Sequence, residues 1–115
     1  MKRRYSLKGR TLFKETYADG KKFHLKGLTL YIKRIENTGN TKTIRFGIVT
    51  KKKIGNAVFR NFIKRRIRSI CREYIPQIDI NCNIILIPGI QICKSDYDIL
   101  QVTLEALFKK AGIII

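Results

Sequence analysis

Hydrophobic and polar residues alternate in two stretches of the chain, residues 28–35 and 43–50. Such alternation predicts strands with one buried face and one exposed face. The turn-forming residues 37–40 separate the two stretches and favour a hairpin between them. Residues 83–87 form a continuous apolar run, which is typical of a strand buried on both faces. The pattern also leaves room for a short additional strand near Lys22–Lys26.

Apolar residues recur at helical spacing in three other segments of the chain. They predict helices over residues 11–18, 57–75 and 95–111. Ser95, followed by Asp96 and Asp98, predicts the N-terminus of the last helix, because such side chains cap free N–H groups and complement the helix dipole.

The order helix, strand, strand, helix, strand, helix predicts an α+β fold, in which a small mixed sheet and the helices form a sandwich. The length agrees with this, since 115 residues suit a domain with one core, and domains commonly have roughly 100–150 residues. There is no internal repeat or Pro/Ser-rich linker. We therefore expect residues 1–115 to form a single domain.

Charge changes the picture from an ordinary α+β domain to one that binds a polyanion. The chain has 25 Lys and Arg against 8 Asp and Glu, a formal net charge of +17. Residues 1–76 carry 22 of the basic and 4 of the acidic residues, so the first two thirds should meet the polyanion. Self-repulsion of this size destabilises a compact chain unless a polyanion neutralises it. Nucleic acid is the usual partner, and an anionic membrane surface is the rival.

The basic residues concentrate in residues 51–72, which contain nine Lys and Arg and no acid. Part of the predicted helix forms a ladder of like charge at i,i+4 spacing: Arg60, Lys64, Arg68 and Arg72. Each such pair costs roughly 0.2–0.5 kcal/mol, and a merely solvated face usually mixes signs. Apolar residues occupy the opposite face: Phe62, Ile63, Ile67, Ile70 and Tyr74. Arg66 is the exception on that face, and its long stem is able to reach an edge.

Nucleic acid fits this helix better than a membrane. A helix on a membrane surface exposes its apolar face to lipid, whereas the strands here need that face for a core. The planar fork of arginine also suits phosphates and base edges. No stretch approaches the roughly 20 apolar residues of a membrane span, and no apolar signal region follows the basic start. A cytoplasmic protein without a membrane partner or small-molecule substrate is expected.

Catalytic and metal-binding chemistry is poorly represented in the chain. The cysteines are odd in number and form no CxxC pair: Cys71, Cys82 and Cys93. His24 is the only histidine, whereas a zinc site needs about four close N or S ligands; three reduced, mostly buried thiols are expected instead. Among the acids only Asp96 and Asp98 are close in sequence, and protein nucleases need clustered carboxylates or paired acid–base groups. The chain alone is therefore not expected to be a nuclease.

A long motif in the chain closely resembles the signature of the bacterial-type ribonuclease P protein subunit: FGIVTKKKIGNAVFRNFIKRRIR, residues 46–68. Its core is a glycine loop followed by a specific set of residues: Ala57-Val58, Arg60-Asn61, Lys64-Arg65 and Arg68. The resemblance is good over residues 5–75, and beyond them it is one of pattern only. Phe59 and Phe62 depart from it, because polar or aliphatic residues are common at these positions in the family.

The resemblance implies an RNA subunit that performs the hydrolysis with Mg²⁺, assisted by a protein that binds ribonuclease P RNA and precursor tRNA. The residues implied to contact the RNA subunit are Lys52, Lys53, Asn56, Arg60, Asn61, Lys64, Arg65 and Arg68. A cleft between the sheet and helices is implied to hold the single-stranded 5′ leader, with Phe13, Tyr17 and Tyr31 at its aromatic positions. A left-handed βαβ crossover is also implied.

The residues themselves favour a single-strand site at Tyr31. This tyrosine lies on the polar face of its strand beside Lys33, and aromatic stacking is worth about 1–3 kcal/mol per base. Phe13 and Tyr17 share a helix face, where a core role is the more common one. The alternative function is a structural RNA-binding protein, such as a ribosomal protein. Such a scaffold has the same charge and size, but no need for Tyr31 on an exposed strand face.

Overall fold

The computed structural model describes residues 5–36, 39 and 42–115. Four α-helices lie in these ranges: α1 (Arg10–Asp19), α2 (Ala57–Tyr74), α3 (Ile90–Cys93) and α4 (Tyr97–Lys110). One sheet contains four strands: β1 (Lys21–Leu25), β2 (Leu28–Arg34), β3 (Ile44–Ile48) and β4 (Cys82–Pro88). Two short 3₁₀ helices flank α2: η2 (Lys52–Ile54) and η3 (Ile75–Gln77). The predicted α+β class with a mixed sheet is confirmed, as is the short additional strand.

The predicted hairpin between residues 28–35 and 43–50 is wrong. The strand order is β1-β2-β4-β3, so that β4 lies between the two strands that were expected to pair. Strand β2 pairs antiparallel with β1 and β4, whereas β3 pairs parallel with β4. The physical reason is that β4 is apolar along nearly its whole length, and only a central position buries both of its faces. Residues 82–86 are indeed all buried, which confirms that part of the prediction.

The hairpin partner of β2 is β1, through the two-residue turn Lys26-Gly27. Both turn residues have positive φ, 47° for Lys26 and 82° for Gly27. Two-residue hairpins favour this backbone because its twist matches that of the strands. The carbonyl of Gly27 accepts a 2.7 Å hydrogen bond from the Gly89 N–H, which attaches the turn to the end of β4.

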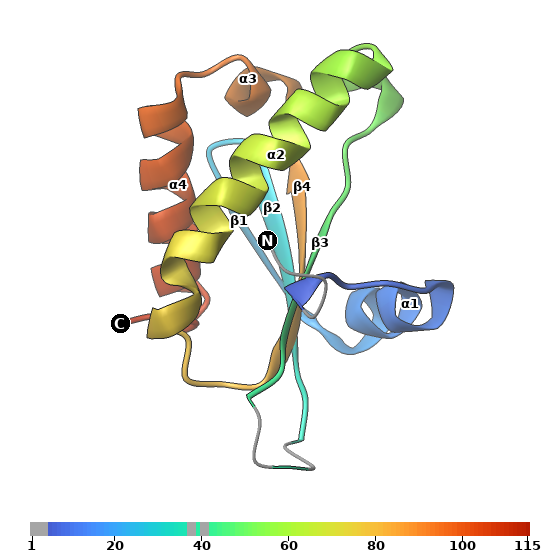
Figure 1. Cartoon of the computed structure of the whole chain (residues 1–115), viewed down its shortest axis with the longest axis vertical. Helices are drawn as coiled ribbons and strands as arrows, with labels where there is room; N and C mark the ends of the chain where they lie inside the picture. The colour runs from blue at the N-terminus through green and yellow to red at the C-terminus, as the bar shows by residue number, and fades with distance from the viewer. Residues whose placement is uncertain (1–4, 37–38, 40–41) are drawn as a thin grey trace.

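Helix α2 connects the parallel strands β3 and β4 and forms a βαβ crossover. In Figure 1 both strands run upward, α2 crosses in front of the sheet, and β4 lies to the left of β3. A connection that returns in front of the sheet to a strand on the left is left-handed. About 98% of such connections are right-handed, so this is the rare crossover that the family resemblance implied.

The core lies between one face of the sheet and the helices α2 and α4 (Figure 1). Strands β2 and β4 contribute Leu28, Leu30, Ile32, Ile84 and Leu86, all buried. The helices contribute Ile63, Ile67, Ile70, Leu104, Leu107 and Phe108, also buried. The opposite sheet face, here called the outer face, packs in part against α1, which contacts β2 and β4. No helix in the described ranges is long and apolar enough to cross a bilayer.

The last helix begins later than predicted. Its N-cap is Asp96 rather than Ser95, and helix α4 starts at Tyr97. The cause is α3, which the sequence did not predict. The hydroxyl of Ser95 donates to the carbonyl of Gln91 in that short helix, at 3.2 Å. Asp98 lies in the first turn of α4, where a carboxylate complements the helix dipole.

The three cysteines are free and buried, as expected. Burial raises the pKa of each thiol, and that of Cys82 rises to about 12 although Arg34 and Lys42 act in the opposite direction. Neutral buried thiols of this kind pack as small apolar side chains.

Candidate nucleic-acid interface

Helix α2 begins with a capped N-terminus and ends against the core. The side chain of Asn56 accepts a hydrogen bond from the Phe59 N–H at 2.9 Å, so one of the predicted RNA contacts is also the N-cap. Ile63, Ile67 and Ile70 face the core as predicted. Phe62 was also assigned to that face, and this is wrong, because 40% of the side chain is exposed.

Three arginines of α2 converge on one hollow of about 330 Å³. Arg65 and Arg68 were predicted site residues, and the structure brings them together with Arg72, Ser6 and Ser69. Arg72 was visible in the sequence as the last member of the like-charge ladder. Ser6 had no sequence signal. It arrives through a parallel bridge to Phe46, which only the tertiary structure creates. Guanidinium and hydroxyl donors around one hollow are suited to a phosphate group.

The basic residues of the loop and of α2 have no acidic partner in the described part of the chain. The ion pairs recorded there involve other lysines: Lys33–Glu15, Lys33–Asp19 and Lys109–Glu105. Glu73 is the one acid of α2, and its carboxylate instead accepts a 2.8 Å hydrogen bond from Gln101. The like-charge repulsion along α2 is therefore not relieved within the described structure.

Arg60 lies half-buried near the start of the ladder. Its Nε is buried and has no hydrogen-bond partner among the described residues, and the same holds for the hydroxyl of Thr50. Buried donors without an acceptor cost about 1–3 kcal/mol, and more when the group is charged. Of the other predicted residues, Asn61 is exposed and Lys64 is half-buried.

The lysines of the basic loop before α2 lie on two different surfaces. Lys52 is exposed in η2. Lys53 lines a hollow of about 230 Å³ together with Lys51, His24 and Thr29. His24 and Thr29 are cross-strand partners whose side chains hydrogen-bond at 2.9 Å. The structure thus places Lys53 beside the sheet and not in the arginine hollow of α2.

The outer face of the sheet carries an aromatic pair. The rings of Tyr17 and Tyr31 meet edge to face, with centroids 4.9 Å apart. The ammonium of Lys22 lies 5.8 Å from the Tyr31 ring centroid, within cation–π range. Partial burial, and then the proximity of Tyr31, raise the pKa of the Tyr17 phenol. Both predicted tyrosines are therefore together, with a cation beside them.

Among the three aromatic residues predicted to bind the leader, Phe13 is the one that packs most closely against the sheet. A Cβ on Gly47 would lie 2.6 Å from the Phe13 Cζ, so the ring lies directly on the backbone of β3. Glycine at this position is what lets α1 approach the sheet. Phe13 is half-buried, whereas 38% of Tyr17 is exposed. Packing therefore accounts for Phe13 more readily than for Tyr17.

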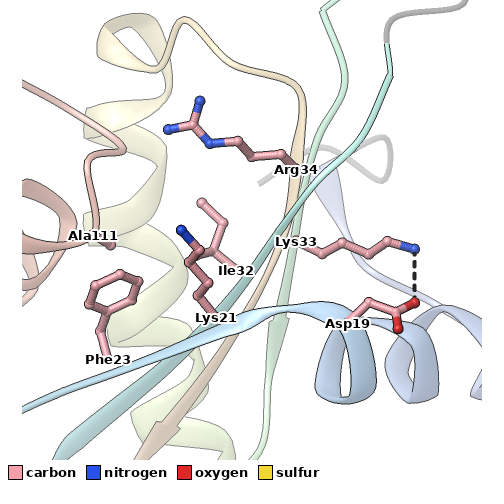
Figure 2. A pocket seen from close by; sticks show the side chains of 7 residues that line it. All are labelled: Asp19, Lys21, Phe23, Ile32, Lys33, Arg34 and Ala111. Carbon is pink, nitrogen blue, oxygen red and sulfur yellow. Dashed lines mark ion pairs between the residues drawn. The ribbon is translucent and has the colours of Figure 1, made fainter.

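Another cavity, of about 350 Å³, lies near the end of α4 and contains none of the predicted site residues. Figure 2 shows its lining: Asp19, Lys21, Phe23, Ile32, Lys33, Arg34 and Ala111. The ion pair between Lys33 and Asp19 stands apart from the other side chains in that view. This pair joins the last residue of α1 to β2.

Similar proteins agree on one family. Residues 1–112 match the family model described as Ribonuclease P. The Ribonuclease P protein component of Syntrophomonas wolfei is 39% identical over 88% of this chain and 82% of its own length. That of Symbiobacterium thermophilum is 30% identical over 99% of this chain and 96% of its own length.

Solved structures show the same fold. The RNase P protein of Staphylococcus aureus superposes with a TM-score of 0.84 at 29% identity, covering 96% of this chain and 98% of that one. The Thermotoga maritima protein gives a TM-score of 0.78 at 26% identity, covering 91% and 96%. These matches confirm the resemblance carried by residues 46–68. This chain belongs to the ribonuclease P protein family, the RNA-binding protein components of a tRNA-processing ribonuclease.

Proposed function

We propose that this protein binds the catalytic RNA subunit of ribonuclease P and the single-stranded 5′ leader of precursor tRNA, and thereby assists removal of the leader. The observation that carries the proposal is a set of basic residues of α2, here called the arginine surface: Arg60, Lys64, Arg65, Arg68 and Arg72. None of them has an acidic partner in the described residues. A polyanion of regular phosphate spacing relieves the repulsion that the chain itself leaves in place.

The RNA subunit is assigned to α2 and its loop. Arg65, Arg68 and Arg72 surround the hollow of about 330 Å³, and each presents a planar fork suited to a phosphate. The half-buried Arg60 contributes a further guanidinium from the start of the ladder. The remaining predicted contacts assigned to the RNA subunit are Lys52, Asn56, Asn61 and Lys64.

The 5′ leader is assigned to the outer face of the sheet. Tyr31 offers a ring for stacking, with Tyr17 at 4.9 Å and Lys22 at 5.8 Å. Lys53 and Lys51 line the neighbouring hollow above His24 and Thr29. Aromatic rings among cations bind single strands with little sequence preference, because every base has a π face. This suits a leader whose sequence differs between precursor tRNAs.

The chemical step is assigned to the RNA subunit with Mg²⁺. Two carboxylates of α1 lie close to one another, but both are bound by one lysine, at 3.6 Å each: Glu15 and Asp19 with Lys33. These two carboxylates are thus engaged in ion pairs with β2. The protein residues act by binding and by positioning the two RNAs.

Cleavage of precursor tRNA by a bacterial-type ribonuclease P RNA tests this proposal. The reaction is run near physiological Mg²⁺ and salt, with and without the protein, and with the protein alone as control. Strong stimulation, together with no cleavage by the protein alone, is expected. Tight RNA binding without stimulation of a cognate RNA would instead favour a structural RNA-binding protein.

A further inference from the structure

An exposed aromatic side chain stands at the border of the arginine surface. Phe62 is 40% exposed, whereas the inner face of α2 is occupied by other residues, which are buried: Ile63, Ile67, Ile70, Cys71 and Tyr74. The half-buried Phe59 supports it from the preceding turn, with ring centroids 6.3 Å apart and ring planes inclined by 30°. Large apolar side chains of this kind usually lie in the core, whereas the described residues leave 40% of Phe62 in solvent.

Arg66 forms a layer on the Phe62 ring. Its guanidinium carbon lies 4.9 Å from the centroid of Phe62 and 5.5 Å from that of Tyr97. Its Nη1 donates to the carbonyl of Ser95 at 3.3 Å. The hydroxyl of Tyr97 in turn donates to Ser69 at 3.3 Å. The guanidinium of Arg66 thus lies between the rings of Phe62 and Tyr97. The long stem of Arg66 reaches the edge of the helix face, as predicted, and its head group ends at the carbonyl of Ser95.

The surroundings of Phe62 favour a nucleic-acid occupant. Arg65 and Arg66 are its i+3 and i+4 neighbours, on the same side of the helix. An apolar protein partner that covered Phe62 would have to desolvate both guanidinium groups without an acid to pair them, which is costly. A nucleotide satisfies both demands, because its base is able to stack on the part of the ring that Arg66 and Phe59 leave exposed, while its phosphate meets the arginines.

We propose that Phe62, held by Arg66 and Phe59, is a stacking platform for an unpaired nucleobase of the RNA subunit. The arginine surface contacts the phosphates of the RNA. The platform adds a contact with an exposed base. The proposal rests on the assignment of α2 to the RNA subunit.

The test is the affinity of the full-length protein for ribonuclease P RNA, measured for Phe62→Leu and Phe62→Tyr. Leucine keeps an apolar side chain and removes the ring, whereas tyrosine keeps the ring. Phe62→Leu is expected to weaken binding roughly 5- to 150-fold, the range that one base stack is worth, and Phe62→Tyr is expected to bind like the unmodified protein. The log–log salt slope should stay unchanged for both, because neither change removes a cation that neutralises a phosphate.

Ile99→Ala provides a matched control, since Ile99 is an exposed apolar residue of α4, which carries none of the cations assigned to RNA. It should leave affinity unchanged. Thermal unfolding of each variant verifies that the fold is intact, and Phe62→Leu is expected to unfold close to the unmodified protein because Phe62 is partly in solvent.

Each remaining outcome decides between the two proposals. If the unmodified protein fails to bind the RNA subunit, the assignment of α2 is wrong and the platform fails with it. If it binds and Phe62→Leu binds equally well, only the platform is wrong. Loss of affinity that Phe62→Tyr does not avoid would overturn stacking in favour of tight apolar packing. Weakened binding of precursor tRNA to the holoenzyme, with RNA-subunit affinity intact, would overturn the RNA subunit as the source of the base.

Discussion

The arginine surface of α2 and the outer face of the sheet are both rich in cations, but they differ in whether those cations are paired with acids. On α2 the ladder that contains Arg68 has no acidic partner in the described residues, and three arginines surround one hollow. On the outer face, Lys33 is bound by Glu15 and Asp19. The aromatic pair there consists of the exposed Tyr17 and the half-buried Tyr31.

This difference separates two ways of binding RNA. Unpaired arginines attract phosphates, release counterions and give an affinity that falls steeply with salt. Aromatic rings bind bases by stacking, which depends less on salt. Under the proposed function, one small domain would hold a structured RNA on one surface and a single strand on another.

Charge reversal in the arginine hollow is expected to have the largest effect, and it tests whether α2 binds RNA through phosphates. The double variant Arg65→Glu/Arg68→Glu should weaken binding of the RNA subunit on the order of 100-fold or more, since each charge-assisted hydrogen bond contributes about 1.5–3 kcal/mol. The log–log salt slope should fall by roughly 0.7–0.9 for each phosphate that the variant no longer neutralises. Filter binding across a salt series measures both. Charge reversal at Lys109 and Lys110 on α4 is the control for net charge, and an unchanged slope in the arginine variant would show that these side chains do not touch phosphate.

The next largest effect is expected on the outer face. Tyr31→Leu removes the ring and should weaken holoenzyme affinity for a precursor tRNA by roughly 5- to 150-fold, the value of one base stack. Affinity for the RNA subunit should not change. Comparison of substrates with long and very short leaders provides the readout, because only the long leader reaches Tyr31. Equal losses for both substrates would contradict the assignment of the leader to this face.

The distance between α1 and the sheet offers a third test. In Gly47→Ala the new Cβ would lie 2.6 Å from the Phe13 ring, so the ring must move. Overpacking of this kind costs about 1–3 kcal/mol, and thermal or urea unfolding should show the destabilisation. Phe13→Leu in the same chain should recover part of it, since the smaller side chain makes room. Additive effects in the double variant would show that the two residues do not touch.

The smallest effect is expected from the ion pairs of α1. Lys33→Met removes both of them, yet exposed pairs are worth only about 0–1 kcal/mol each. Unfolding free energy should therefore change little, and RNA-subunit affinity not at all. Lys109→Met, which removes the i,i+4 pair of α4, is a control of the same kind. A large destabilisation by Lys33→Met alone would mean that α1 depends on charge and not on the packing of Phe13 against Gly47.

Local pattern was sufficient for most elements and for part of the site. The predicted helix 57–75 corresponds to Ala57–Tyr74, because its apolar residues recur at helical spacing along its whole length. The motif also identified Arg65 and Arg68 before their hollow was visible. The pairing of residues 28–35 with 43–50 was predicted wrongly, because neighbours in sequence compete with a more apolar strand that arrives later in the chain.

By itself, the sequence determined the family, the charged face of α2 and the elements with a regular period. These properties are local, since spacing of 2 or 3.6 residues decides which side chains share a face. Only the tertiary structure decided that β4 separates β2 from β3, that Ser6 joins Arg72 at the hollow, and that Phe62 stays exposed beneath Arg66. Those outcomes depend on which distant segments bury the most apolar surface together, and no local period encodes that competition.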